Sequence, residues 1–245
     1  MTTRRDALLS LSFSLLTACG AAQPKEDDPM HKDERAGHTP HVMKGDSLDE
    51  RRRHGFTAPE KYAEAWNDPS RDAWQKPEEI LAAMQIAPGM ILVDLGAGTG
   101  YLLPELASAT GGAGKVVALD VSQQMITYLD DAIEAEGMAN VSTLLGTHDD
   151  PKLDAQSVDR IVTLNTWHHI TNRVSYAKKL AMSLTPGGSL IVVDFVAAKT
   201  DGFGPPQEMR LSAQTVKSEL EAAGFTAEIV EETLERHYIV RGVVP

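Results

Sequence analysis

VDLGAGTG, residues 93–100, is the stretch that decides the fold of this chain. A short aliphatic run ends in Asp94, and glycines at positions 96, 98 and 100 let the backbone approach a ligand before the next helix begins. A dinucleotide-binding fingerprint needs a glycine at position 101, which is Tyr101 here, and no phosphate-binding GxxxxGKS or GxxxxGKT sequence occurs. Such a loop alone also serves to close a strand–helix corner, so its surroundings have to be considered.

Strand-like and helix-like segments alternate around this loop. Strands are predicted at residues 90–95, 115–119, 141–145, 158–165, 189–196, 226–230 and 237–243. Helices are predicted from the loop to residue 109 and at residues 123–136, 173–184 and 212–223. Alternation of this kind predicts an α/β fold with a mostly parallel, doubly wound sheet, in which ligands bind at the carboxyl ends of the strands.

Two further strand ends carry acids that suit a nucleoside. Asp120 ends the second strand, 20 residues after Gly100, where a carboxylate can accept hydrogen bonds from two ribose hydroxyls. Val121 and Ser122 open the next helix, and Ser122 suits its N-cap. Asp149 follows the third strand, where an adenine amino group could donate to it. Three strand ends of this kind are more specific than the glycine loop alone.

These motifs resemble those of class I S-adenosylmethionine-dependent methyltransferases. The resemblance covers about residues 56–245 and rests on DLGAGTG, ALDVSQQM and LTPGGSLIVVDF. It implies a Rossmann-like, seven-stranded sheet whose last strand runs antiparallel. It also implies that the glycine loop holds the methionine part of S-adenosyl-L-methionine, with Asp120 at the ribose and Asp149 at the adenine. The residues expected to bind this cofactor are Asp94, Gly96, Ala97, Gly98, Gly100, Asp120, Val121, Asp149 and Asn165.

The fourth predicted strand leads toward the methyl acceptor. In the family that this chain resembles, the end of that strand faces the transferring methyl group. Asn165 is therefore a candidate hydrogen-bonding residue, and His168 or His169 a candidate catalytic base. The alternative is that one histidine caps the following helix and the other is a core residue. Asp194, at the end of the fifth strand, either faces the same cleft or caps a turn.

Three tryptophans are expected around the mouth of this cleft. Trp66 and Trp74 precede the first strand, and Trp167 follows the fourth, in a chain that is only 5% aromatic. An aromatic pocket suits a flat or apolar acceptor, so the three are candidate substrate contacts. The alternative is that Trp66 and Trp74 only dock the leading helix. Arg71, between them, either binds an acidic group or pairs with a neighbouring aspartate.

The N-terminal segment resembles a bacterial lipoprotein signal. A short basic start and an apolar run at residues 7–16 precede LTAC, residues 16–19, which is similar to a lipobox. Cys19, the only cysteine of the chain, would then be lipidated. We expect a signal peptide at residues 1–19, a disordered polar linker at 20–55 and the methyltransferase domain at 56–245. The alternatives are an ordinary buried helix and, less well matched, a twin-arginine export signal.

Composition limits the partners. The net charge is −12, all of it arising after residue 53, which argues against nucleic-acid binding. One cysteine excludes an internal disulfide and a cysteine-rich zinc site, and no other metal is expected. We expect a small-molecule or lipidic acceptor. We also expect the protein to be anchored to a membrane through a lipid, on its periplasmic or extracellular side. Because the cofactor is made in the cytosol, a cytoplasmic enzyme that starts at Met30 or Met43 stays open.

The sequence alone therefore predicts a methyltransferase whose acceptor is unidentified. Two other functions remain open at this point. One is a non-catalytic lipoprotein that binds S-adenosylmethionine, and the other is an oxidoreductase that transfers a hydride. The oligomeric state does not follow from the sequence.

Overall fold

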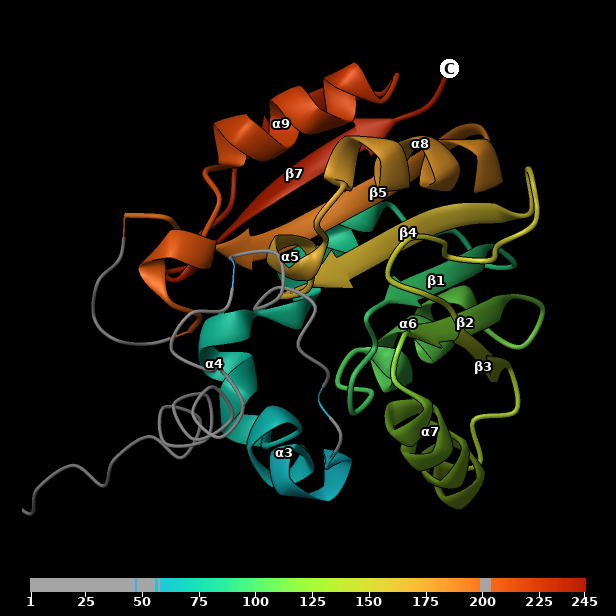
Figure 1. The fold of residues 1–245 in the computed structure, drawn as a ribbon. Coiled ribbons are helices and arrows are strands. Elements are labelled where there is room, and N and C mark those ends of the chain that lie inside the picture. The colour runs from blue at the N-terminus through green and yellow to red at the C-terminus, as the bar shows by residue number, and fades with distance from the viewer. Residues whose placement is uncertain (1–46, 48–55, 57, 199–203) are drawn as a thin grey trace, which may run out of the picture.

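The computed structural model describes residues 47, 56, 58–198 and 204–245, and within them the chain forms one seven-stranded sheet (Figure 1). The strand order is β3-β2-β1-β4-β5-β7-β6. Strands β1 to β5 pair with one another in parallel, and β7 is antiparallel to both β5 and β6. The expected doubly wound fold with an antiparallel last strand is confirmed. The strands are β1 (Ile91–Leu95), β2 (Lys115–Asp120), β3 (Val141–Leu145), β4 (Val158–Leu164), β5 (Leu184–Phe195), β6 (Thr226–Val230) and β7 (His237–Val243).

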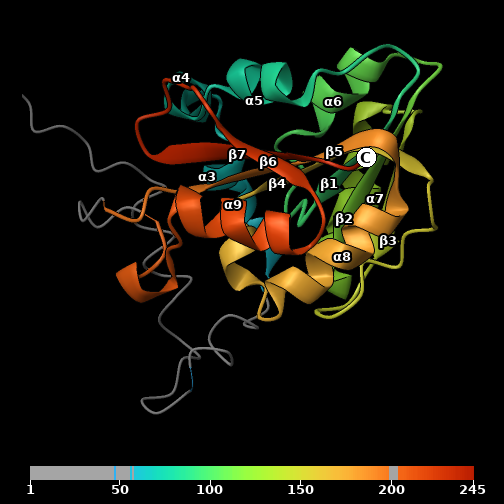
Figure 2. The same cartoon turned by 90° about the horizontal axis from the view of Figure 1, so that it is seen from above.

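Helices cover both faces of the sheet (Figure 2). One face carries α5 (Pro77–Met84), α6 (Leu103–Thr110) and α7 (Gln123–Glu136). The other carries α8 (Arg173–Ser183) and α9 (Ala213–Ala222). Successive residues of β1 serve the two cores, because side chains alternate across a strand: Leu92 packs with α5 and α6, and Val93 packs with α8.

The predicted boundaries are close, with one instructive difference at β5. Helix α7 and strands β3, β6 and β7 have the predicted bounds. Strand β5 begins at Leu184 and not at residue 189, because Leu184 pairs with Val158 before the register shifts and Ser189 pairs with Arg160. The Pro-Gly-Gly segment between them is extra chain accommodated at this irregularity. Sequence patterns read it as a turn, and only the pairing shows that the strand begins before it.

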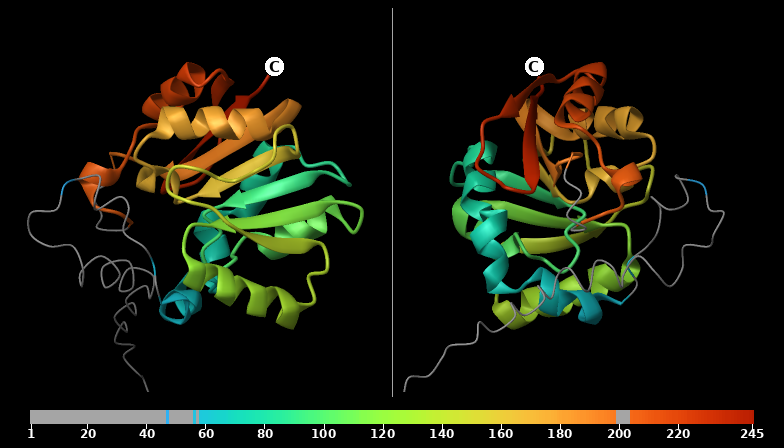
Figure 3. Two further views of the ribbon diagram at one scale, coloured as in Figure 1. Left: turned by 45° about the vertical axis from the view of Figure 1, so that its right-hand side comes forward. Right: turned by 90° about the vertical axis from the view of Figure 1, so that its left-hand side faces the viewer.

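A short helical segment lies across the end of the sheet toward which β4 and β5 point (Figure 1). It consists of α3 (Pro59–Trp66), the 3₁₀ helix η1 (Pro69–Arg71) and α4 (Asp72–Gln75). Helix α3 lies beside α7 (Figure 3). This segment therefore covers the carboxyl ends of the parallel strands, where the strand-end residues are.

The predicted signal peptide, Cys19 and nearly all of the predicted linker lie outside the described residues. In the part of the chain that the structure describes, no helix is long and apolar enough to cross a membrane.

Candidate active site

A cavity opens at the carboxyl ends of β1, β4 and β5. Its walls are the glycine loop, the segments that follow β4 and β5, and the side chains of α3 and η1. The space measures about 900 Å³ with its open mouth included. Residues from several distant parts of the sequence therefore face one volume.

The glycine loop is fixed by its own backbone. The N–H groups of Gly96 and Ala97 both donate to the carbonyl oxygen of Leu119, at 2.7 and 3.0 Å. Gly96 has a φ of +76°, and a Cβ at this position would lie 2.4 Å from the side chain of Thr166. Both observations require glycine here. The loop therefore lies directly against the segment that follows β4.

Asp120 connects the glycine loop to helix α7. Its carboxylate accepts hydrogen bonds from the backbone N–H of Gly98 at 3.0 Å and of Ser122 at 2.9 Å. Burial raises the pKa of Asp120, and these backbone hydrogen bonds oppose the rise. The carboxylate thus lies where the sequence placed it, at the end of β2 beside the loop. It is bonded to the protein's own backbone and does not line the cavity.

Three other predicted cofactor residues also lie away from the cavity walls. Gly100 serves packing, since a Cβ there would lie 3.1 Å from both Leu103 and Leu129. Val121 is 37% exposed. Asp149 is exposed in the turn after β3, and its carbonyl oxygen accepts a hydrogen bond from Lys179 Nζ at 2.7 Å. Contacts of these residues with a nucleoside therefore remain predictions.

A buried carboxyl group and a buried guanidinium cation both line the cavity. Asp94 is 3% exposed, and burial, followed by the charge of Asp120, raises its pKa to about 7. Arg71 is 6% exposed, and its Nη1 donates to the carbonyl of Trp66 at 2.7 Å while Nη2 donates to Gln75 Oε1 at 3.2 Å. The sequence left two roles open for Arg71, the binding of an acidic group and pairing with a neighbouring aspartate. Its burial against the cavity was not visible in the sequence.

Arg71 is held over an aromatic ring. Its guanidinium carbon lies 3.9 Å from the centroid of the Tyr101 ring, within the range of a cation–π interaction. Its charge also lowers the pKa of Asp94, against the larger effect of burial. The cation is thus fixed in place beside the carboxyl group.

Asn165 directly follows β4 and has a strained backbone conformation. Its φ is +57°, its backbone N–H donates to the carbonyl of Val193 at 2.9 Å, and its side chain lines the cavity. Its Oδ1 is buried and has no hydrogen-bond partner among the described residues. Strain together with an unsatisfied polar atom is typical of a functional position. The prediction of a site role for Asn165 therefore gains a physical basis.

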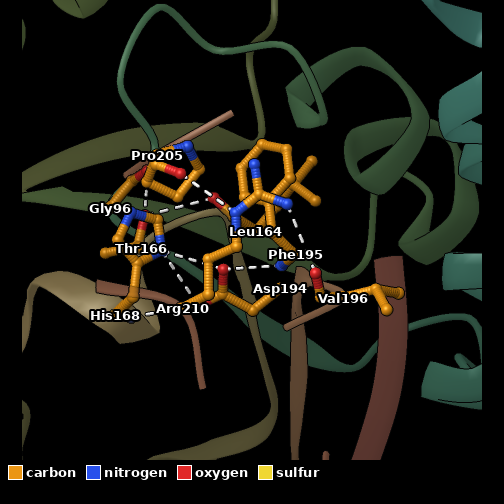
Figure 4. Close-up of polar contacts among 9 residues, drawn as sticks. All are labelled: Gly96, Leu164, Thr166, His168, Asp194, Phe195, Val196, Pro205 and Arg210. Atoms are coloured by element: carbon orange, nitrogen blue, oxygen red, sulfur yellow. Dashed lines mark hydrogen bonds and ion pairs between the residues drawn. The ribbon is translucent and has the colours of Figure 1, made fainter. Parts of the chain in front are cut away.

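His168 and Asp194 form a buried pair at the ends of β4 and β5 (Figure 4). His168 is 2% exposed, and its Nδ1 lies 2.8 Å from Asp194 Oδ1. The backbone N–H of His168 donates to Asp194 Oδ2 at 3.0 Å, and that of Phe195 donates to Oδ1 at 2.8 Å. Burial acts to raise the pKa of Asp194, but His168 and these hydrogen bonds together lower it. Of the two roles left open for Asp194, these backbone hydrogen bonds agree with the capping of a turn, and Asp194 does not line the cavity.

His169 takes a different environment from its neighbour. Its ring contacts that of Phe56 edge to face at 5.7 Å between centroids, and lies 4.2 Å from the ring of His168. Both histidines line the cavity. His168, buried and bonded to Asp194, also has the environment of the core residue in the alternative interpretation, so the catalytic role of either histidine stays a prediction.

Of the three tryptophans, Trp66 alone lines this cavity. It stacks on Tyr62 with ring centroids 4.7 Å apart. Trp74 stacks on His237 instead, at 5.8 Å. Trp167 is fully buried, and its Nε1 donates to Glu219 Oε2 at 3.1 Å. The expectation that all three surround the mouth is therefore wrong for Trp74 and Trp167, because neither side chain lines the cavity.

No group of three or more His, Cys, Asp or Glu side chains suited to a metal ion occurs within the described ranges.

Known proteins resemble this chain over the same region. A family model described as a methyltransferase domain matches residues 92–188. A ubiquinone/menaquinone biosynthesis C-methyltransferase of Hydrogenovibrio crunogenus is 28% identical over 111 residues, covering 45% of this chain and 44% of that protein. A demethylmenaquinone methyltransferase of Bacillus cereus is 27% identical over 131 residues, 54% of either chain. The chain thus spans about half the length of the curated relatives it matches.

A solved structure extends the similarity to nearly the whole described part. It is a SAM-dependent methyltransferase from Aquifex aeolicus, 29% identical, which covers 76% of this chain and 98% of its own, with a TM-score of 0.71. The chain therefore has the Rossmann-like fold of S-adenosylmethionine-dependent methyltransferases, and its residues 92–188 are similar in sequence to a methyltransferase domain.

Proposed function

We propose that this protein is an S-adenosylmethionine-dependent methyltransferase that acts on a small-molecule acceptor. The observation that carries the proposal is one cavity in which the glycine loop, Asp94 and Arg71 face Asn165 and His168. A donor and an acceptor of a methyl group must meet within one enclosed site, and this cavity brings a cofactor loop and candidate acceptor residues together. The family match and the Aquifex structure support the same activity.

The residues present fit the amino-acid end of S-adenosylmethionine. That end carries an ammonium and a carboxylate group, and the cavity offers the buried carboxyl of Asp94 and the buried guanidinium of Arg71. Opposite charges in a poorly hydrated site favour a zwitterion strongly. The unsatisfied Oδ1 of Asn165 is a third group in the same wall that needs a donor. Asp94, Arg71 and Asn165 would hold this end of the cofactor.

The chain's own residues mainly orient the reactants and exclude water. The cofactor, when bound, supplies an electrophilic methyl group on a sulfonium. The loop of residues 96–98, which is itself fixed by hydrogen bonds to Leu119, would lie against the cofactor, and the aromatic side chains of α3 line the cavity and would help to exclude water. His168 or His169 then accepts a proton from an acceptor that has one to lose, and Asn165 orients the acceptor or the cofactor.

Two measurements test this proposal. Calorimetry with S-adenosylhomocysteine tests the pocket, and Asp94→Asn should weaken binding by about 10–100-fold. Incubation of the protein with a cell extract and isotope-labelled S-adenosylmethionine, followed by mass identification of labelled products, tests transfer. Binding without any transfer would instead support a non-catalytic binding protein. Tight binding of NAD in place of S-adenosylhomocysteine would revive the oxidoreductase alternative.

The acceptor class receives limited support from the relatives. Those named above are, by name, methyltransferases of quinone biosynthesis. They support a small-molecule acceptor over a macromolecular one. A lipidic acceptor agrees with the largely aromatic wall formed by Phe56, Tyr62 and Trp66.

We also propose that Cys19 carries a lipid and that the mature protein is anchored on the periplasmic or extracellular side of a membrane. The support is the sequence of residues 1–19 alone. Labelling with palmitate should mark the wild-type protein and not Cys19→Ala. An unlabelled, soluble wild type would overturn the anchor and favour a cytoplasmic enzyme that starts at Met30 or Met43.

A further inference from the structure

We propose that the methyl acceptor carries an oxyanion, a carboxylate or a phosphate group, which binds at the end of the cavity bounded by Arg71, Phe195 and Pro205. This inference rests on the proposed methyl transfer and deepens it. It is carried by the positive charge and the buried hydrogen-bond donors that gather around this end of the cavity.

Three arginines lie around the aromatic side chains at this end. The guanidinium carbon of Arg210 lies 5.6 Å from the centroid of the Phe195 ring. The guanidinium carbons of Arg71 and Arg236 lie 5.8 and 5.7 Å from the centroid of the Trp74 ring. The chain as a whole has a net charge of −12, so this group of cations is a local exception. Its positive potential attracts an anion.

His237 connects the three arginines. Its ring stacks on Trp74 with centroids 5.8 Å apart, and its centroid lies 4.4 Å from that of Phe195. Burial lowers the pKa of His237 to about 3; Asp194 opposes this shift, and the charges of all three arginines add to it. The three cations are therefore close enough to act on one ring, which stays neutral.

Two buried side chains beside these arginines have polar atoms that lack a partner. Gln75 is fully buried, and its Oε1 accepts a hydrogen bond from Arg71, but its Nε2 has no partner among the described residues. The same holds for both ring nitrogens of His237, which is also fully buried. An amide nitrogen and the N–H of a neutral imidazole are donors, as guanidinium groups are. Such a set of groups fits an anion that accepts hydrogen bonds directly or through a bridging water.

Arg210 is bonded to the cavity wall itself. Its Nε donates to the carbonyl oxygen of Pro205 at 2.9 Å, and its Nη1 donates to that of Val196 at 3.3 Å (Figure 4). Both acceptors are uncharged, so these two bonds orient the guanidinium without cancelling its charge. Because Pro205 lines the cavity, this charge lies next to the proposed anion.

Arg71 separates the proposed anion from the cofactor. Its guanidinium carbon lies 3.9 Å from the centroid of Tyr101, which follows the glycine loop, and 5.8 Å from that of Trp74. The cofactor's carboxylate belongs to the Tyr101 side of this arginine. The acceptor's anion belongs to the other side, toward Phe195 and Arg210.

A small acceptor can reach from the reacting centre to this end. The ring centroid of Phe195 lies 6.2 Å from that of His168, and both side chains line the cavity together with Asn165. An acceptor whose reacting atom lies near Asn165 therefore extends to Phe195 with its opposite end. The aromatic walls between them suit an apolar middle part. The acceptor class is thus an acid with an apolar body.

The first test titrates the complex with S-adenosylhomocysteine, kept saturated, with three probes followed by NMR. Benzoate and phenyl phosphate carry the two oxyanions, and benzamide is the uncharged match of benzoate. At least one anion should bind and benzamide should not, and the tighter anion identifies the group. Equal binding of benzamide and benzoate, or no binding of either anion, would overturn the inference. Displacement of S-adenosylhomocysteine would also overturn it, because the anion would then belong to the cofactor site.

The second test changes the charge behind the wall. Arg236→Gln should weaken binding of the anion by roughly 5–20-fold, and Arg236→Lys, which keeps the charge, by less than about 3-fold. Arg241→Gln is the matched control, because Arg241 bonds to Glu228 and pairs with Ile191, several residues along β5 from Phe195. It should bind the anion as wild type does. Equal losses in Arg236→Gln and Arg241→Gln would reflect net charge alone and contradict a local site.

Crystals of the same complex with 4-bromobenzoate locate the probe. The anomalous signal of bromine should place the ring against Phe195, with the carboxylate toward the arginines. A probe bound elsewhere, or ordered water alone at Gln75 and His237, would overturn the inference.

The outcomes separate the two proposals. Affinity for S-adenosylhomocysteine, measured for each variant, shows whether the fold and the cofactor site survive the substitution. A protein that binds this ligand but neither anion contradicts the acidic acceptor alone. A protein that does not bind it contradicts the proposed function itself.

Discussion

The two halves of the cavity are built from different kinds of contact. The cofactor half, residues 94–98 with Asp120, is held by backbone N–H groups that donate to Leu119 and Asp120 on the adjacent strand. The acceptor half, residues 165–169 with Asp194, is held by bonds from Asp194 to residues of a neighbouring strand's end, 26 positions away. Backbone contacts demand glycine at fixed spacing, whereas the acceptor half tolerates many side-chain solutions. The first half can therefore be recognised in the sequence as a motif, and the second cannot.

The largest effect on stability is expected where the glycine loop contacts Thr166, between the two halves of the cavity. Gly96→Ala places a Cβ 2.4 Å from Thr166 and forces alanine to a φ of +76°. We expect a loss of roughly 2–5 kcal/mol in the free energy of unfolding, from backbone strain plus overpacking. Denaturant unfolding of the purified variant measures this, and binding of S-adenosylhomocysteine should be lost with it.

Gly137→Ala is the matched control for this change. Gly137 ends α7 with a φ of +67° and has no atom near enough to clash with a Cβ. It should lose only about 1–2 kcal/mol, the cost of the left-handed conformation alone. Equal losses at the two positions would show that Thr166 does not press on the glycine loop.

The next effect concerns Asp94 and pH. Its folded pKa of about 7 lies above the 3.8 of an unperturbed aspartate, so the folded state holds the proton more tightly than the unfolded state. Below about pH 4 this carboxyl group therefore does not lower the free energy of unfolding. As the pH rises from about 4 to about 7, it lowers that free energy progressively. In the wild type, the free energy of unfolding should decline by on the order of a few kcal/mol between pH 4 and pH 8 because of this group, and Asp94→Asn should remove that decline. Denaturant unfolding of both proteins across this pH range measures it. Parallel curves for the two proteins would contradict it.

A third effect distinguishes two acids at strand ends. Asp120→Asn disturbs a carboxylate that holds the loop and α7 together, and affinity for S-adenosylhomocysteine should fall about 10–100-fold. Asp149→Asn changes an exposed side chain outside the cavity and should change affinity by less than about 2-fold. Calorimetry on both variants measures this. A large loss in Asp149→Asn would restore its assignment to the adenine.

The smallest effect separates two tryptophans, one that lines the cavity and one that does not. Trp66→Phe alters a cavity wall and should raise the KM for the methyl acceptor by about 2–10-fold, since an aromatic contact contributes roughly 1 kcal/mol. Trp74→Phe should leave that KM within error, because Trp74 packs on His237. Steady-state kinetics with both variants gives the comparison. A greater effect in Trp74→Phe would mean that the acceptor extends beyond the cavity described.

Sequence patterns predicted the elements well where the chain's own chemistry sets them. Ser122 caps α7 and accepts a hydrogen bond from the N–H of Met125, and Gly137 ends the same helix in the left-handed conformation. Both signals are local, so the bounds of α7 followed from sequence. The start of β5 did not, because it depends on pairing with Val158 on a different strand.

The site divides in the same way. The positions of Asp94, Gly96 and Gly98 at the cavity followed from the spacing of the loop, whereas Asp120 lies beside the loop and outside the cavity walls. The burial of Arg71 against the cavity and the pairing of His168 with Asp194 did not follow. Each depends on a neighbour that is distant in sequence, and an arginine among aspartates looks like a surface residue when read alone.

By itself, the sequence determined the α/β class, the glycine loop and the acids at its strand ends, because backbone geometry restricts residue types at fixed spacing. Only the tertiary structure decided that Trp66 lines the cavity while Trp74 and Trp167 do not, and that Asp194 holds His168. These depend on which surfaces meet when α3, β4 and β5 come together. Such contacts depend on the packing of the whole chain, and no local sequence pattern predicts them.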